Sequence, residues 1–522
     1  MLVGDIPYNN KQHFPDKVGI VDETARYTWR ETNSRVNRLA NSMIDFGLKK
    51  GDRVAIISEN CHQYLEFLFA SAKAGLISVT LNYRLSVEQM CAILNDCEPK
   101  LVFIHEAFRN IVKPLQNSMP SIEYFVGIGQ NADCAFEFLE LIEKSSDDEP
   151  NVEISEQDVH RIQYTTGTTG RPKGVMLTHE NTIFNCIWRV LTKIGALSMN
   201  DVVLEWMPFF AAGGQGKAIS HCFLGCKTVL CKFKAETVLT IVEKEQVTCT
   251  TLNYPSFRII QKYLAESNRT FDLKSLQIIT MAGGSPFTPE QVVEILDYFN
   301  VPHHNTSIGY AMSETATTGT VQRGEDIAAS LGSNATEAEI NRLRSVGNPM
   351  YLGQIRVVDE DGKDLPAGEP GEIIIKNKAV MKGYWKQPDI TQQVLKDGWY
   401  WTSDLGYLDV EGKLYITGRK DFLIKSGGFF VSPEEVEHHL ARHPQVAEVA
   451  VVPIPDEKWG KVLKAVVCLF PGGTVTTDEI IDFCRTGLAN YQVPKVVEFR
   501  DSLPREDATN KLKRKELLES EK

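Results

Sequence analysis

A regular alternation of helical and apolar segments constrains this fold more than any other feature of the sequence. Between Tyr27 and Thr80 a helical pattern (TWRETNSRVNRLANSMIDFG) is followed by an apolar strand (RVAIIS), a second helix (CHQYLEFLFASAKAG) and a second strand (ISVTL). The same order returns at residues 92–104, 237–252 and 273–284. Because parallel strands need crossover helices, the alternation predicts layered α/β sheets covered by helices.

The length and two changes of pattern predict the domain organisation. A chain of 522 residues exceeds what one hydrophobic core usually supports. Residues 353–377 carry short β runs separated by Asp-Gly and Pro-Ala-Gly turns, and a new α/β alternation begins beyond residue 421, with SPEEVEHHLARHP as a capped helix. We therefore predict a large N-terminal domain, 1–420, with a small β-rich subdomain at about 350–420, and a smaller α+β domain at 421–522.

The net charge and the cysteines indicate which partners and which cellular compartment to expect. The formal net charge of −12 argues against a nucleic-acid partner, since phosphate binding rests on clustered Lys and Arg. Eleven cysteines are scattered without a CxxC pair, which favours reduced thiols and a cytoplasmic location. The run HCFLGCKTVLC, residues 221–231, matches no zinc spacing, so its cysteines are predicted to act as small hydrophobes.

Neither a secretory signal nor a membrane crossing is expected. The first residues, MLVGDIPYNNKQHFPDK, lack a basic region followed by an apolar stretch. The apolar run YLEFLFASAKAGLISVTL is interrupted by Glu66 and Lys73, and it is therefore predicted to form a buried helix and strand.

The stretch YTTGTTGRPKG, residues 164–174, is the strongest local indication of function. It follows the apolar run RIQYT and precedes the amphipathic segment HENTIFNCIWRVL, so we expect a loop between a strand and a helix. Its glycines let an anion approach the backbone, its threonines donate hydroxyl hydrogen bonds, and Lys173 adds positive charge. The stretch predicts a polyphosphate site, although the lysine follows a proline and the Walker pattern is absent. The alternative is an ordinary mobile solvent loop.

This stretch resembles the signature loop of the adenylate-forming enzymes, a superfamily that includes acyl-CoA synthetases, luciferases and adenylation domains of peptide synthetases. Further segments resemble family motifs in the family's order: GYAMSET (309–315), YWTSDLG (400–406), ITGRKDFLIKSGGFFVSPEEVE (416–437) and LPREDATNKLKRKEL (503–517). The resemblance covers almost the whole chain and is closest to the acyl-CoA synthetase or fatty-acid–CoA ligase type.

The resemblance implies a reaction in two halves, with ATP, Mg²⁺ and coenzyme A. A carboxylate first attacks the α-phosphate of ATP to give an acyl-adenylate and diphosphate, and a thiol then attacks the adenylate carbonyl. The C-terminal domain is expected to be mobile and to turn about Asp421 between the halves. A pantetheine on a carrier protein, a luciferase-type oxygenase and a degenerate nucleotide-binding member remain alternatives, and a homodimer stays open.

The resemblance also implies roles for individual residues. Glu314 is expected near Mg²⁺, Asp404 at the ribose hydroxyls, and Arg419 at the ribose or a phosphate. The predicted phosphate-binding residues are Thr165, Thr166, Gly167, Thr168, Thr169, Gly170 and Lys173, of which Thr165 and Lys173 are also expected to act in catalysis. The residues expected around the adenine and its neighbourhood are Gly283, Gly284, Tyr310, Ala311, Met312 and Ser313.

Two sites in the C-terminal part follow from the same resemblance. Lys511 matches the family's catalytic lysine, but Asn510 stands where glycine is usual and the spacing differs by one residue, so Lys513 and Lys515 remain candidates. Ser426, Gly427 and Gly428 are expected to line a narrow channel for the CoA thiol, with an ordinary hairpin turn as the alternative.

The segment WMPFFAAGGQG, residues 206–216, bears on the acid substrate. Relatives that activate amino acids carry an aspartate here to hold the substrate ammonium, whereas this chain has no acid, which favours a carboxylic acid without an α-amino group. An apolar pocket would suit a medium- or long-chain or other apolar acid. Its candidate lining residues are Trp206, Phe209, Phe210, Tyr254, Tyr310 and Met312, with ordinary core packing as the alternative for each.

Overall fold

The computed structural model covers the chain except at a set of short segments, and the description below leaves these out. The omitted residues are 120–121, 131–132, 166–171, 193–196, 283–286, 332–334, 337–338, 341, 427–428, 457–459, 471, 506–511 and 520–522. The side chains of residues 421, 425, 426, 429, 430, 515 and 519 are left out as well.

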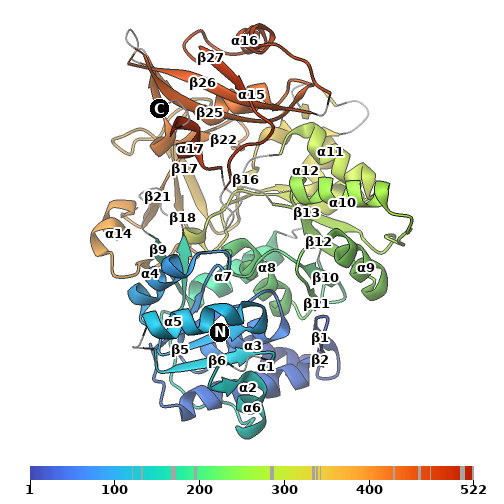
Figure 1. The fold of residues 1–522 in the computed structure, drawn as a ribbon, viewed down its shortest axis with the longest axis vertical. Coiled ribbons are helices and arrows are strands. Elements are labelled where there is room, and N and C mark those ends of the chain that lie inside the picture. Colours follow the sequence, from blue (N-terminus) through green and yellow to red (C-terminus); the bar gives the residue numbers. More distant parts are fainter. Residues whose placement is uncertain are drawn as a thin grey trace. The chain divides into compact units, whose positions relative to one another are not determined.

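The chain divides into two compact units, each an α/β arrangement (Figure 1). Unit one contains residues 1–355 and 375–400, and unit two contains residues 356–374 and 401–522. The predicted fold class, a large α/β N-terminal part and a smaller C-terminal part, is confirmed. Residues 401–420 pack with unit two, whereas the sequence placed the limit near 421. The predicted domains, 1–420 and 421–522, were defined by an expected hinge at Asp421 and not by packing. That division of the chain stays a prediction.

The first sheet of unit one is mostly parallel and has antiparallel edges. Its central strands run in the order β14-β13-β12-β10-β11-β1, all parallel, and β15, β16 and β2 complete it in antiparallel pairs. The strands are β1 (Val18–Val21), β2 (Arg26–Thr28), β10 (Val202–Glu205), β11 (Lys227–Leu230), β12 (Cys249–Leu252), β13 (Ile278–Met281), β14 (Thr306–Ile308), β15 (Thr320–Arg323) and β16 (Asn348–Pro349).

The second sheet of unit one carries the glycine-rich stretch. Its order is β19-β9-β8-β4-β3-β5-β6-β7, with antiparallel pairing only around β9. The strands are β3 (Arg53–Ile57), β4 (Ile77–Thr80), β5 (Leu101–His105), β6 (Tyr124–Ile128), β7 (Phe136–Glu137), β8 (Val159–Thr165), β9 (Lys173–Thr178) and β19 (Gly383–Tyr384). The nearby β20 (Leu395–Lys396) pairs with the start of β21.

Helices cover these sheets, and several begin at side-chain caps that the sequence shows. Thr28 with Glu31, Ser86 with Gln89 and Thr178 with Asn181 form capping boxes, which satisfy backbone donors at helix starts. The helices are α1 (Asp5–His13), α2 (Trp29–Asp45), α3 (His62–Lys73), α4 (Val87–Cys97), α5 (Val112–Ser118), α6 (Phe138–Lys144), α7 (His179–Leu191), α8 (Ala212–Phe223), α9 (Ala235–Glu245), α10 (Tyr254–Glu266), α11 (Pro289–Tyr298), α12 (Gly324–Ser330) and α14 (Pro388–Val394). Short 3-10 turns lie at η1 (Glu106–Ile111), η3 (His303–Asn305), η4 (Ser313–Thr315) and η5 (Arg342–Arg344).

Burial explains the apolar runs of the sequence. The run containing Glu66 and Lys73 forms the buried helix α3 and strand β4, as predicted. Cys222, Cys226 and Cys231 lie buried, and they pack as small apolar side chains. Among the described residues, no helix has both the length and the apolar character needed to cross a bilayer.

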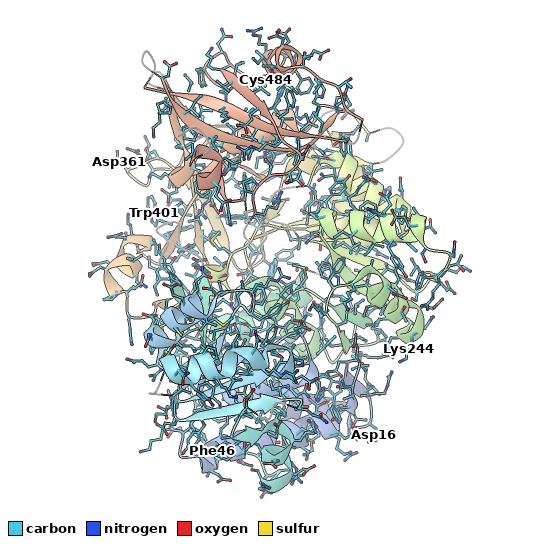
Figure 2. The ribbon with its side chains drawn as sticks, viewed as in Figure 1. Asp16, Phe46, Lys244, Asp361, Trp401 and Cys484 are labelled. Carbon is cyan, nitrogen blue, oxygen red and sulfur yellow. The ribbon has the colours of Figure 1, made fainter. Side chains whose placement is uncertain are left out.

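Unit two is built on antiparallel strands with helices against them. The long hairpin of β25 (Val446–Asp456) and β26 (Gly460–Leu469) is extended by the parallel strand β27 (Val496–Phe499), next to α15 (Pro433–Leu440), α16 (Thr477–Arg485) and α17 (Arg514–Glu519) (Figure 1). Cys484 of α16 is buried in this core (Figure 2). The remaining elements are β17 (Gln354–Val358), β18 (Gly371–Lys376), β21 (Trp399–Leu408), β22 (Leu414–Arg419), η6 (Lys420–Phe422), β23 (Ile424–Ser426) and β24 (Phe429–Val431), the first three of which cross the limit between the units.

Helix α15 confirms a predicted helix but not its predicted cap. The Ser432 side chain accepts no hydrogen bond from a backbone N–H of the first turn. Its hydroxyl donates instead to the carbonyl oxygen of Thr417 and to the carboxylate of Glu434. A tertiary acceptor therefore replaces the local cap.

Candidate functional site

The glycine-rich stretch connects two antiparallel strands. The prediction that it lies between a strand and a helix is wrong, because residues 173–178 form β9, which pairs with β8 so that Thr165 faces Lys173 and Tyr164 faces Gly174. The segment KGVMLT contains apolar and β-branched residues, which favour a strand, and this strand ends before α7 begins. The loop therefore opens from the end of a hairpin, with Thr165 and Lys173 at its two ends.

The base of this hairpin is held tightly. Tyr164 donates its phenol hydrogen bond to the carboxylate of Asp96, and the indole nitrogen of Trp385 donates to the carbonyl of the same residue at 3.1 Å. A Cβ at Gly174 would lie 2.8 Å from Ile162 and 3.2 Å from Trp385, so only glycine fits there. Burial raises the pKa of Tyr164, which keeps this phenol protonated.

Three predicted or neighbouring residues meet beside the hairpin. The phenol of Tyr384, on β19, donates to Oε1 of Glu314 at 2.9 Å, and the backbone N–H of Met381 donates to the carbonyl of Glu314 at 2.7 Å. The Lys173 ammonium lies 5.3 Å from the centre of the Tyr384 ring. The structure thus brings Lys173 and Glu314 to one tyrosine, with the ammonium near its ring and the carboxylate at its hydroxyl.

The carboxylate of Glu314 has one oxygen, Oε2, that could coordinate a magnesium ion. Its Oε1 accepts the Tyr384 bond, while its Oε2 accepts no hydrogen bond from the residues that the structure describes. Mg²⁺ takes few protein oxygens and keeps most of its waters. A carboxylate held at one oxygen and open at the other fits that requirement.

The segment that carries Glu314 has an unusual backbone. Ala316 and Thr317 both have positive φ, 46° and 65°, which is uncommon for residues with a side chain. A Cβ at Gly319 would lie 2.2 Å from the carbonyl of Tyr310, so glycine is required where the chain folds back. The hydroxyl of Thr315 donates to the carbonyl of Met312 at 3.2 Å and is buried.

The residues of segment 310–313 that are predicted to lie near the adenine differ in solvent exposure. Tyr310, Met312 and Ser313 are half-buried and Ala311 is exposed, so the segment is open to a ligand along most of its length. Gly283 and Gly284 follow β13, as predicted, but lie outside the described residues. Their role at the adenine stays a prediction.

Asp404 and Arg419 form a cross-strand ion pair within unit two. They face each other in the antiparallel register of β21 and β22, and the Arg419 Nε lies 2.8 Å from Oδ1 of Asp404. The Asp404 side chain is 14% exposed and its backbone N–H donates to the hydroxyl of Thr402 at 3.0 Å. Ser403 between them has φ of 60°. The predicted ribose residues are therefore brought together, with one charge largely compensated by the other.

Several predicted residues lie outside the description. These are Thr166, Gly167, Thr168, Thr169, Gly170, Gly427, Gly428 and Lys511, and the side chains of Asp421, Ser426 and Lys515. Ser426 ends β23, and its backbone pairs with Phe429 of β24, which is the hairpin geometry that the sequence left as an alternative to a thiol channel. Lys513 is described and its ammonium lies 2.8 Å from Glu516. The assignments of Ser426 and of the catalytic lysine stay predictions.

Two of the candidate pocket residues, Trp206 and Phe209, lie in the hydrophobic core, which was the alternative for them, and the pocket itself stays a prediction. Trp206 packs against Phe233 with ring centres 4.6 Å apart, and Phe209 packs edge-on to Tyr64 at 5.4 Å. Both are almost fully buried in hydrophobic clusters. Aromatic side chains after a strand favour core packing where neighbours from two layers meet them. Phe210, Tyr254, Tyr310 and Met312 remain half-buried.

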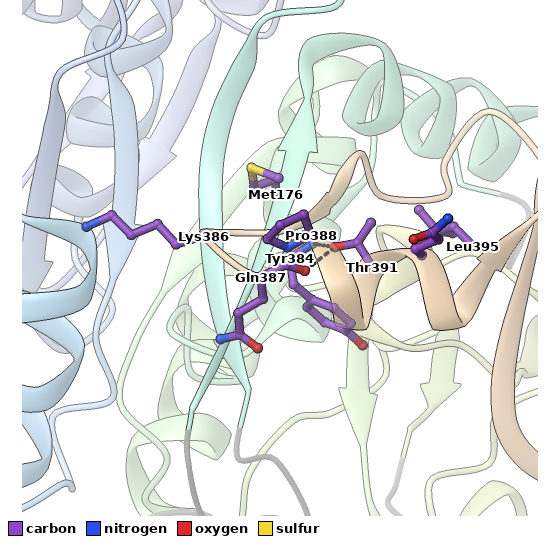
Figure 3. A pocket seen from close by; sticks show the side chains of 8 residues that line it. Met176, Tyr384, Lys386, Gln387, Pro388, Thr391 and Leu395 are labelled. Carbon is purple, nitrogen blue, oxygen red and sulfur yellow. Dashed lines mark hydrogen bonds between the residues drawn. The ribbon is translucent and has the colours of Figure 1, made fainter.

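A surface cavity lies behind Tyr384, but it is not the predicted site. It has a volume of about 400 Å³ and is bounded by Met176 of β9, Tyr384, and Thr391 and Leu395 of the α14 region (Figure 3). The backbone N–H of Tyr384 donates to the hydroxyl of Thr391 at 2.9 Å (Figure 3). Within the described part of the chain, none of the predicted site residues lines it. Its neighbours fix β19 and so fix the tyrosine that holds Glu314.

Sequence reasoning missed Tyr384 and Trp385. Both follow Gly383, whose φ of 146° and whose approach to Thr391 leave no room for a side chain. The only signal was a Gly-Tyr-Trp run in a polar region. Its meaning depends on pairing with β9, about 210 residues earlier in the chain, which no local pattern reports.

Comparisons with known proteins agree with the geometry. Residues 8–385 match the family model for AMP-binding enzymes, and residues 435–510 match the model of the AMP-binding enzyme C-terminal domain. A feruloyl-CoA synthase from Amycolatopsis sp. is 32% identical over 509 residues, with 96% of each chain covered, and an indoleacetate–CoA ligase from Aromatoleum aromaticum is 30% identical, covering 94% of this chain and 92% of the relative. The o-succinylbenzoate CoA synthetase from Bacillus subtilis, solved with ATP and a magnesium ion, superposes with a TM-score of 0.81 at 28% identity, covering 98% of this chain and 99% of that one.

Proposed function

Since the chain belongs to the AMP-binding enzyme family and is an AMP-forming acyl-CoA synthetase, we propose that it joins an aromatic carboxylic acid without an α-amino group to coenzyme A. Its cofactors are ATP, Mg²⁺ and coenzyme A, and it acts through an acyl-adenylate. The observation that carries the proposal is the meeting of Lys173, Tyr384 and Glu314 beside the hairpin loop.

Two observations support an aromatic acid over the finer prediction of a medium- or long-chain acid. The names of the relatives reported above are those of ligases for feruloyl, indoleacetate and succinylbenzoate groups. Trp206 and Phe209, the largest apolar candidates for an acyl tunnel, lie in the core. An aromatic acid needs a shorter and more polar pocket than a long alkyl chain.

The residues of unit one have distinct roles in the proposed adenylation step. Lys173, at the end of the hairpin, stabilises the negative charge that spreads over the phosphates as diphosphate leaves. Glu314 supplies its open oxygen to Mg²⁺, which neutralises phosphate charge when bound. Tyr384 positions Glu314 through the 2.9 Å hydrogen bond.

The residues of unit two are proposed to hold the sugar and complete the reaction. The Asp404 carboxylate accepts hydrogen bonds from the ribose hydroxyls, while the ion pair with Arg419 orients it. Lys511 is proposed to bridge the substrate carboxylate and the α-phosphate. Residues 427–428 are proposed to lie beside the thiol in the second step.

The two halves can be tested separately. A panel of aryl, arylalkyl and fatty acids is scored first by acid-dependent exchange of labelled diphosphate into ATP without CoA, and then by thioester formation with CoA. We expect both activities with aryl acids, and Lys511→Ala should lose the exchange while retaining ATP binding. Exchange without a thioester from any acid would contradict coenzyme A as the acceptor.

Two coarser predictions remain open alongside this proposal. A cytoplasmic location is supported by the eleven cysteines, all of which are unpaired. A homodimer also stays a prediction, and sedimentation of the purified chain would test it.

A further inference from the structure

A buried lysine on α8 has no ion-pair partner among the residues that the structure describes. Lys217 is 9% exposed, and its ammonium donates to the hydroxyls of Thr251 at 2.7 Å and Thr280 at 3.2 Å. An ammonium carries three donors, and the third finds no acceptor among the described residues. Within that part of the chain, no carboxylate lies at ion-pair distance from Lys217.

One further cation, Arg189, and one acid, Glu205, act on the charge of Lys217. Arg189, on α7, donates to Asn185 at 3.3 Å and approaches Thr317 at 3.5 Å, again without an ion pair in the described structure. Glu205 is the nearby buried acid, and its Oε1 lies 2.7 Å from the ring of His221. Burial and the Arg189 charge lower the pKa of Lys217 to about 8, so it is mostly protonated at pH 7. A buried charge without a counter-ion is costly, which indicates that an anion completes this site.

Lys217 lies at the edge of the sheet where ligands of α/β proteins bind. Thr251 and Thr280 are the last-but-one residues of the parallel strands β12 and β13. The next parallel strand, β14, leads directly into the segment that carries Tyr310 and Glu314. Open α/β sheets bind ligands at the carboxyl ends of their strands. The lysine therefore lies at the carboxyl ends of β12 and β13, the edge of the sheet from which the segment carrying Glu314 also leaves β14.

The same face of α8 is open one turn before the lysine. Gly213 lies four residues before Lys217, which puts both on one side of the helix. A Cβ built on Gly213 would meet no atom within 4 Å, whereas a Cβ on Gly214 would lie 2.6 Å from the carbonyl of Met207. Gly216 is likewise blocked, by the Thr317 hydroxyl at 2.8 Å. Space for a side chain is therefore open at Gly213 and closed at Gly214 and Gly216.

We propose that Lys217 binds a second carboxylate at the far end of the acyl substrate, so that the enzyme activates an aromatic dicarboxylic acid. The inference rests on the proposed function and names its substrate class. The first carboxylate is activated beside Lys173 and Glu314, the aromatic body occupies the space at Gly213, and the distal carboxylate accepts the third N–H of Lys217. Arg189 strengthens the positive potential without touching the substrate.

A matched pair of acids tests the proposal. 3-Phenylpropionate and 3-(4-carboxyphenyl)propionate share one body and differ in the distal carboxylate, and kcat/KM is measured for each by diphosphate release and by CoA thioester formation. The wild-type enzyme should prefer the diacid by at least about 30-fold. Lys217→Met should lower kcat/KM for the diacid about 50-fold and change the value for the monoacid less than threefold. Lys262→Met, at an exposed lysine of α10, is the control and should leave both unchanged.

Two further variants keep the outcome clear. Lys217→Gln retains a donor of similar length and should give an intermediate loss on the diacid. Gly213→Val fills the open space and should lower kcat/KM for both acids about tenfold. Equal use of the two acids by the wild-type enzyme, or equal losses in Lys217→Met, would overturn the dicarboxylate inference and leave the ligase proposal intact. If no acid of the wider aryl and fatty panel gave a thioester, the proposed function itself would fail, and this inference with it.

Discussion

Unit one and unit two treat the charges of their predicted site residues in opposite ways. In unit two, Arg419 and Asp404 form a direct ion pair across two strands. In unit one, the structure gives Lys173 an aromatic ring and gives Glu314 a phenol, and it gives Lys217 two hydroxyls. The contrast supports the proposal that the unit-one side chains bind a charged ligand and that the unit-two pair, whose charges compensate each other, binds hydroxyl groups.

The largest expected effect comes from removing the charge of Glu314. Glu314→Gln keeps the shape and the Tyr384 contact but removes the anionic ligand, so adenylation should fall by about 10²–10³-fold. The measurement is diphosphate exchange over a range of Mg²⁺ concentrations, in which the half-saturating Mg²⁺ should rise. Glu266→Gln on α10 is the control. A loss of adenylation activity below fivefold would contradict the proposed role of the Glu314 charge in binding Mg²⁺. The contrast with Asp404 would then no longer hold.

Removing the unpaired charge of Lys217 should stabilise the folded protein. The pKa is lowered from 10.5 to about 8 on folding, which costs roughly 3 kcal/mol of stability at neutral pH. The variant also loses the hydrogen bonds to Thr251 and Thr280, which offsets part of this gain. Lys217→Met should therefore raise the free energy of unfolding by about 1–2 kcal/mol at pH 7.

The pH dependence gives the sign of this effect. The unfolded state binds more protons than the folded state between about pH 8 and 10.5, so the wild-type protein regains stability as pH rises through that window. The advantage of the variant should therefore disappear near pH 10.5, as measured by urea unfolding at pH 7 and 10.5. A variant less stable than wild type at pH 7 would show that the lysine is already compensated, like Arg419.

Loss of the Tyr384 hydroxyl should cost less than loss of the Glu314 charge, because the hydroxyl positions Glu314 and carries no charge itself. Tyr384→Phe keeps the ring beside Lys173 and should lower kcat of adenylation about 5- to 10-fold, since a hydrogen bond to a charged group contributes about 1.5 kcal/mol. The Mg²⁺ dependence should shift in the same direction as in Glu314→Gln but less. Tyr263→Phe on α10 serves as the matched control, and an equal loss there would remove the special role of Tyr384.

The smallest expected change in folding stability concerns the ion pair of unit two. A double-mutant cycle of Asp404→Asn and Arg419→Gln should give a coupling of about 0.5–1 kcal/mol in unfolding free energy, because the Arg419 side chain is 42% exposed. The ATP KM should rise about tenfold in Asp404→Asn alone. Coupling above 3 kcal/mol would make the pair a structural element and weaken its proposed role at the ribose.

Local patterns account for the elements but not for their partners. The strands and helices of 27–80 follow from alternation and from the Thr28–Glu31 capping box. The hairpin at 164–174 was misread because a strand and a helix start can share a short apolar run, and pairing with β8 decided the matter. Apolar character alone does not distinguish a residue that lines a pocket from a core residue. Only the structure shows that Trp206 and Phe209 lie in the core.

The sequence by itself determined the α/β class, the order of the motifs and the charges that they carry, because these depend on composition and short-range periodicity. Only the tertiary structure decided that Tyr384 holds Glu314, 70 residues away, and that Lys217 meets Thr280, 63 residues away, with no acid beside it in the described chain. Whether a buried charge is compensated depends on which distant side chains pack around it. That packing is set by the sheet register and not by any local pattern.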